Sequence, residues 1–108
     1  MEWMHEEMAN KILQLAERIE RGHPLPHGHK LMDQEAEKEL ERIAKMYQLK
    51  IGQVPSEVIE KLISAFKKCL SLNFFWPDIK EEIEKAIKNL EKTIEDLSWP
   101  PSKPFPSH

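Results

Sequence analysis

Apolar residues recur at helical spacing along four separate stretches of the chain. In the first stretch, residues 2–21, one apolar side chain returns every three or four positions. Because an α-helix has 3.6 residues per turn, this spacing places the apolar side chains on one face. They are Met4, Met8, Ile12, Leu15 and Ile19. Arg21 and Gly22 then supply a basic last turn and a residue suited to a left-handed cap, so we expect the helix to end there.

A segment rich in proline and glycine separates the first stretch from the second. Residues 22–29 contain two prolines and two glycines, which cannot continue a helix, and they predict a loop. The second helix is predicted over residues 33–49, with Asp33 as its N-cap. Its apolar stripe consists of Ala36, Leu40, Ile43, Ala44 and Tyr47.

Two further helices are predicted over residues 56–72 and 78–97. The third is the most apolar of the four, and its stripe includes Cys69, which we interpret as a small core residue rather than a reactive thiol. The fourth begins with Asp78 and Glu81 at the spacing of a capping box, and its apolar residues form nearly a heptad seam.

These elements predict an all-α protein, an antiparallel four-helix bundle of the up-and-down type. Every connection except the first is short, which favours antiparallel neighbours. The chain has 108 residues, the usual size of one domain, and we place the bundle at residues 1–97. Residues 98–108 contain four prolines and predict a non-helical tail.

Composition limits the classes of function. The net charge is -3, from 16 basic and 19 acidic side chains, so no overall positive field attracts nucleic acid. No apolar run approaches the ~20 residues that cross a bilayer, and the N-terminus lacks the pattern of a secretory signal. We therefore expect a soluble, cytoplasmic protein that binds neither nucleic acid nor membrane.

Residues 41–68 also have the outline of a helix-turn-helix motif. A recognition helix presents basic and amide side chains in its first turns, where they reach the bases. Here Glu57 and Glu60 occupy those positions. The lysines of this helix, at positions 61, 67 and 68, come too late. Two consecutive bundle helices are the favoured interpretation.

Local signatures of catalysis are missing from the sequence. The chain has three glycines, too few for a glycine-rich cofactor loop, and it has no Gly-x-Ser-x-Gly turn. Cys69 has no neighbouring histidine that would activate it. We predict no catalytic residues and no cofactor, and an enzyme whose ionisable groups meet only on folding stays an open alternative.

Histidines offer the alternative of a metal-binding protein. His23, His27 and His29 lie within seven residues of the first loop, and imidazole is a good ligand for zinc and similar divalent transition metals. Their spacing matches no standard site. Glu2 and His5 have the Glu-x-x-His spacing of carboxylate-bridged di-iron bundles, but a complete site needs a second pair, which a symmetric dimer would supply.

Methionine and aromatic residues form two groups, one at the start of the first helix and one after the third. They are Trp3, Met4, Met8, Phe74, Phe75 and Trp76. We expect the two groups to meet at one end of the bundle, where they form either a core plug or an adaptable binding surface. Together with the heptad seam, they predict a binding or scaffolding protein that forms a homo-oligomer or engages a protein partner.

Overall fold

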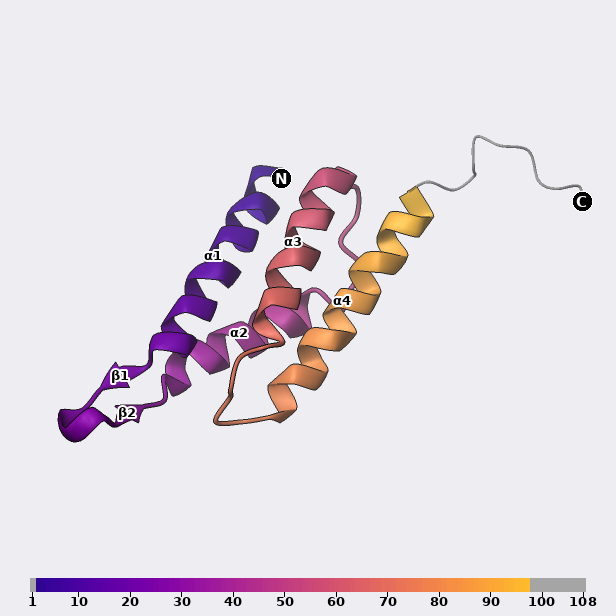
Figure 1. Ribbon diagram of the computed structural model, residues 1–108. Helices are drawn as coiled ribbons and strands as arrows, with labels where there is room; N and C mark the ends of the chain where they lie inside the picture. Colours follow the sequence, from indigo (N-terminus) through magenta and orange to yellow (C-terminus); the bar gives the residue numbers. More distant parts are fainter. Residues whose placement is uncertain (1, 98–108) are drawn as a thin grey trace, which may run out of the picture.

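The computed structural model describes the backbone of residues 2–97 and the side chains of residues 4–97 (Figure 1). The helices are α1 (Glu2–Arg21), α2 (Gln34–Met46), α3 (Ser56–Cys69) and α4 (Asp78–Leu97). The all-α class and the four helices are therefore confirmed, although α2 and α3 each end three residues before the predicted position. The proline-rich tail predicted at 98–108 lies outside the described residues.

A small two-stranded sheet, which the sequence did not predict, connects α1 to α2. Strands β1 (His23–Pro24) and β2 (Lys30–Leu31) pair antiparallel, with His23 opposite Leu31, and a 3₁₀ turn at Pro26–Gly28 joins them. Residues 22–31, hereafter the hairpin arm, project beyond the end of α1 (Figure 1).

A close approach at the base of the hairpin arm requires glycine at position 22. Gly22 has a φ of 63°, a left-handed conformation that side-chain-bearing residues rarely adopt. A Cβ atom at this position would also lie 2.8 Å from the carbonyl oxygen of Leu31. The chain can therefore turn from α1 into β1 only where the side chain is missing.

The principal packing pairs are α1 with α2, α1 with α3, α3 with α4 and α2 with α4. In Figure 1, α1 and α3 begin at the same end and run in the same direction, while α4 returns beside α3. A simple up-and-down ring would instead pack α2 against α3. Residues 47–55 lie between those two helices, and an extended segment of this length spans up to ~30 Å, so the chain can cross the bundle before α3 begins.

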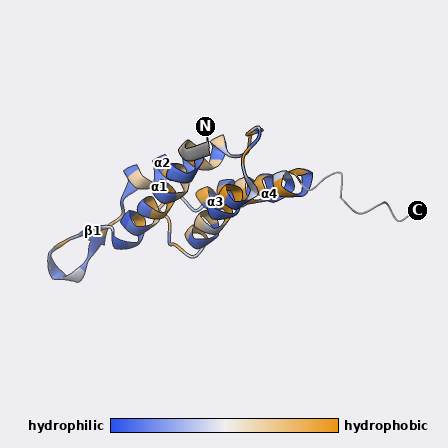
Figure 2. Ribbon diagram, turned by 90° about the horizontal axis from the view of Figure 1, so that it is seen from above, coloured by the Kyte–Doolittle hydropathy of each residue, from blue (hydrophilic) through white to orange (hydrophobic). Residues whose placement is uncertain are grey.

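The apolar faces of all four helices meet in one core, and Figure 2 shows hydrophobic and hydrophilic residues alternating along each helix. Its fully buried members include Ile12, Leu40, Ile43, Ile59, Leu62, Phe66, Ile79, Ile83 and Leu90. Burial of one such side chain stabilises the fold by roughly 1.5–3 kcal/mol. Cys69 is buried among them. Its burial raises the pKa of the thiol to about 12, so the thiol stays protonated at neutral pH. Within residues 2–97, no helix is both long enough and apolar enough to cross a lipid bilayer.

Candidate functional site

A buried carboxylate holds the base of the hairpin arm. Asp33 caps α2 by accepting a hydrogen bond of 3.0 Å from the backbone N–H of Ala36, as the sequence predicted. Arg18 of α1 donates two more, from Nε at 3.1 Å and from Nη2 at 3.2 Å. The Nε2 atom of His23, on β1, lies 3.4 Å from the same carboxylate. Asp33 thus joins α1, the hairpin arm and α2 at one point.

The environment of Asp33 favours its ionised form. Burial alone would raise the pKa of this carboxyl group, but the hydrogen bond from Ala36 and the guanidinium of Arg18 outweigh burial and lower it. A second contact lies nearby, where Lys30 of β2 donates a hydrogen bond of 2.5 Å to the carbonyl oxygen of Glu20. The hairpin arm is therefore fixed to the bundle from both of its strands.

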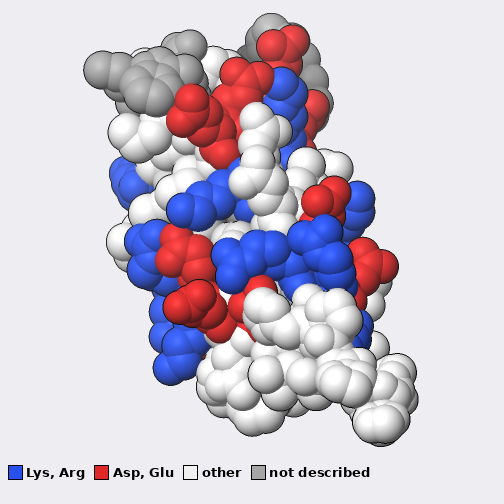
Figure 3. Space-filling model, turned by 90° about the vertical axis from the view of Figure 1, so that its left-hand side faces the viewer, with Lys and Arg blue, Asp and Glu red and all other residues white. Residues whose placement is uncertain are grey.

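The surface of the hairpin arm differs from the rest of the molecule. Every residue from His23 to Leu31 is exposed, including Leu25 at 44% and Leu31 at 55%. Residues 22–29 contain no lysine, arginine, aspartate or glutamate. Figure 3 shows the resulting uncharged area at the lower end of the molecule, below a face on which basic and acidic side chains alternate.

The three loop histidines lie on the hairpin arm and all are exposed. His23 faces Asp33, His27 occupies the turn with a φ of 70°, and the carbonyl oxygen of His29 accepts a hydrogen bond from the N–H of Leu25. Among the side chains that the structure describes, no three from histidine, cysteine, aspartate and glutamate are grouped so that they could hold a metal ion.

His5 contacts a buried tyrosine. Its Nδ1 atom lies 2.7 Å from the hydroxyl oxygen of Tyr47, and Tyr47 in turn packs edge-on against Phe66. Burial raises the pKa of Tyr47 to about 12, so its hydroxyl keeps its proton, and the tautomer of His5 decides which of the two groups donates. Burial also lowers the pKa of His5. The side chain of Glu2, the proposed partner of His5, lies outside the described residues.

The two methionine and aromatic groups do not meet, and the expectation that they would was wrong. Met4 and Met8 lie near the start of α1, which is joined to the start of α3 by the ion pair between Glu6 and Lys61. The aromatic group follows the end of α3, at the opposite end of the molecule (Figure 1). The cause is that α1 and α3 run in the same direction. The side chain of Trp3 is not described.

A buried glutamate organises the aromatic group. Glu37 of α2 is fully buried, and its carboxylate accepts hydrogen bonds from the backbone N–H groups of Phe75 at 2.9 Å and Trp76 at 3.1 Å. Phe74 is buried, Trp76 is half-buried beneath Lys38, and Phe75 is exposed. Most of this group therefore closes the core, and sequence reasoning missed the glutamate that holds it.

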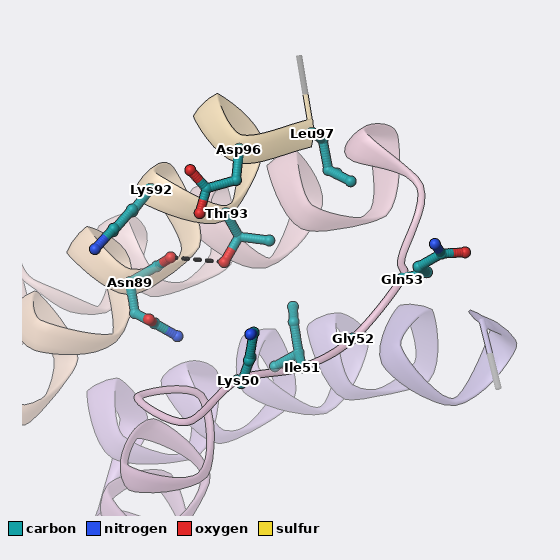
Figure 4. Close-up of a pocket in the computed structure, with 9 residues that line it drawn as sticks. All are labelled: Lys50, Ile51, Gly52, Gln53, Asn89, Lys92, Thr93, Asp96 and Leu97. Carbon is teal, nitrogen blue, oxygen red and sulfur yellow. Dashed lines mark hydrogen bonds between the residues drawn. The ribbon is translucent and has the colours of Figure 1, made fainter. Parts of the chain in front are cut away.

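A cleft of about 540 Å³ lies between residues 50–53 and the last turns of α4 (Figure 4). We call it the α4 cleft. Ile51 and Leu97 give it apolar walls, and Lys50, Lys92 and Asp96 line it as well.

No protein-family model, no curated protein and no solved structure matches this chain.

Proposed function

We propose that this protein is a small helical binding or scaffolding protein that self-associates through its hairpin arm. The observation that carries the proposal is the arm itself, a projecting hairpin that exposes two leucines, Leu25 and Leu31, and carries no lysine, arginine, aspartate or glutamate over residues 22–29. The buried core draws no side chain from residues 22–31, so the hydrophobic residues of the arm are not needed to close it.

The attachment of the hairpin arm to the helices supports a role in binding. A loop that becomes ordered only on contact loses conformational entropy, which weakens association. Here Asp33 and Lys30 already fix both strands to the helices. An arm held in this way can bury Leu25 and Leu31 against another surface at a lower entropic cost.

A second copy of this chain is the partner that we propose. Among residues 2–97, each strand of the two-stranded sheet has one neighbour and one free edge, and two identical edges can pair around a two-fold axis. The chain carries a net charge of -3, so two copies repel each other at most orientations. Residues 22–29 have no aspartate, glutamate, lysine or arginine, and with their histidines neutral they can meet their equivalents without that repulsion.

Light scattering of the full chain over a concentration series tests the proposal. We expect the mass to approach that of a dimer as the concentration rises, and the single variants Leu25→Asp and Leu31→Asp to remain monomeric. Leu13→Asp is the matched control, because Leu13 is an exposed leucine on α1. A wild-type chain that is monomeric throughout, or a control that disrupts the dimer equally, would refute self-association through the arm.

The alternative is a metal-binding protein that uses His23, His27 and His29. The observation in its favour is that one exposed arm carries all three imidazoles, so a pair of arms would bring two such sets together. The same mass measurement, repeated with zinc and with a chelator, separates the two ideas. Association that requires zinc and is lost in His27→Ala and His29→Ala supports metal binding, whereas association that a chelator leaves unchanged supports apolar contact.

A further inference from the structure

The apolar stripe of α4 becomes progressively less covered toward the end of the helix. Leu90 is fully buried, Ile94 is half-buried and Leu97 is 45% exposed. Ile51 points from the α2–α3 connection toward the same turns (Figure 4). The α4 cleft therefore opens where two apolar side chains from different segments face each other with space between them.

Hydrogen bonds close the α4 cleft at one of its ends. Asn89 of α4 donates from its side-chain amide to the carbonyl oxygens of Tyr47 at 2.8 Å and Leu49 at 2.9 Å, which fixes the start of the connection. Gly52, with a φ of 76°, then turns the connection along the side of the cleft. The two walls are thus joined at one end and separate at the other.

The position at which the chain leaves α4 indicates what fills this space. Leu97 is both a wall of the cleft and the last described residue, and Ser98 and Trp99 follow it in the sequence. Two residues reach up to ~7 Å, so an indole at position 99 lies within range of the cleft.

We infer that the α4 cleft is the docking site for the continuation of this same chain, with the indole of Trp99 inserted between Ile51 and Leu97. A tryptophan side chain buries ~150–250 Å² of surface on packing, more than any other residue of the tail could. Attachment at Leu97 gives the tail a high effective concentration at the cleft, so modest apolar contact suffices for occupancy. This inference does not depend on self-association through the hairpin arm.

Fluorine NMR of the full chain labelled with 5-fluorotryptophan tests the inference. The chain has three tryptophans, and the signal of Trp99 is assigned by its loss in Trp99→Phe. We expect this signal to be displaced from its position in urea and to show a reduced solvent-isotope shift, because water is excluded from a docked indole. Leu97→Asp and Ile51→Asp should each return it to the position in urea.

Controls keep a failure to fold from being mistaken for release of the tail. The signal of Trp76, which directly precedes the start of α4, should stay unchanged in both variants, because the α4 cleft lies at the other end of that helix. Leu97→Asp adds its charge at an exposed position, so it preserves folding even if Ile51→Asp does not. Leu31→Asp, on the hairpin arm, should leave the signal of Trp99 where it is.

Two results would overturn the inference. The first is a signal of Trp99 in the native chain that coincides with its position in urea and does not respond to Leu97→Asp. The second is a displaced signal that moves toward the position in urea on dilution, since this would place the tail of a second copy in the cleft. A displaced signal that is independent of concentration and sensitive to Leu97→Asp supports docking of the chain's own tail.

Discussion

Asp33 and Glu37 are the buried carboxylates among residues 4–97, and both accept hydrogen bonds from backbone N–H groups. Asp33 was predictable, because an aspartate directly before an apolar stripe is a common N-cap. Glu37 was not predicted, although a signal existed: it stands three residues before Leu40 and seven before Ala44, on the buried face of α2. A charged residue at such a position is normally assigned to solvent, and only the neighbouring chain reveals its partners.

Replacement of Glu37 by the similarly shaped glutamine should lower the free energy of unfolding. In Glu37→Gln the side chain keeps its shape, but an uncharged amide oxygen replaces a carboxylate and an amide N–H₂ faces a backbone N–H donor. We expect the free energy of unfolding to fall by about 2 kcal/mol, measured by urea denaturation. Glu35→Gln is the control, because the side chain of Glu35 is 95% exposed and its change should have little effect. Equal stability of the two variants would contradict this account of Glu37.

His5 should make the fold sensitive to mild acid. Burial lowers its pKa below the ordinary value of 6.5, so in the window just below pH 6.5 the unfolded chain binds a proton that the folded chain does not. Stability must therefore decrease as the pH falls through that window. Urea denaturation at pH 7.5 and pH 5.5 measures the effect. We expect His5→Asn to lose less stability between the two pH values than the wild type, and His29→Asn, at an exposed position, to behave like the wild type.

At the scale of elements, the helices could be predicted and the hairpin could not. Each helix carries an apolar stripe along at least three turns, and that periodicity survives in the sequence. Each strand of the hairpin arm has two residues, which is too short for an alternating pattern, and prolines made the segment look like a loop. The contacts that order it, through Gly22 and Asp33, join residues whose proximity appears only on folding.

Glycine substitutions separate the two ends of the hairpin arm. Gly22 and Gly28 both have positive φ, but an added Cβ meets the Leu31 carbonyl oxygen at Gly22 and nothing within 4 Å at Gly28. Gly28→Ala should therefore cost only the conformational penalty, about 1–2 kcal/mol of local stability. Gly22→Ala should cost more and should remove the protection of arm amides in hydrogen exchange. Similar protection in the two variants would show that the close approach at Gly22 does not order the arm.

At the scale of the whole molecule, the sequence indicates which faces are buried but not which helices face one another. An apolar stripe on α1 can pack against α2, α3 or α4 equally well. The length of a connection excludes only some pairs of neighbouring helices. Residues 47–55 looked like an ordinary link between neighbours, yet they carry the chain across to start α3 beside the start of α1. The expectation that the methionine and aromatic groups meet was wrong for a different reason. The first and third helices of an up-and-down bundle run in the same direction whichever helices are neighbours, so the start of α1 and the end of α3 lie at opposite ends.

Ion pairs across the helix interfaces allow this arrangement to be tested in solution. Lys11 lies 3.3 Å from Glu39 on α2, Lys61 of α3 pairs with Glu6 of α1, and Lys67 lies 3.6 Å from Glu91 on α4. A carbodiimide, which joins a lysine to a carboxylate without a spacer, should therefore link α1 to α2, α1 to α3 and α3 to α4. Mass spectrometry of the monomer band identifies these links and excludes those between copies.

The link between Glu6 and Lys61 is the decisive one. It joins the starts of α1 and α3, helices that a simple up-and-down ring places across a diagonal, where a spacer-free reagent does not reach. Glu7 provides the control, because it is adjacent to Glu6 and also exposed but lies one position further around the helix. We therefore expect Glu7→Gln to preserve the cross-link and Glu6→Gln to abolish it. Cross-links between α2 and α3 in place of that link would instead support the simple up-and-down ring. Only helices in direct contact bring a lysine and a carboxylate within bonding distance.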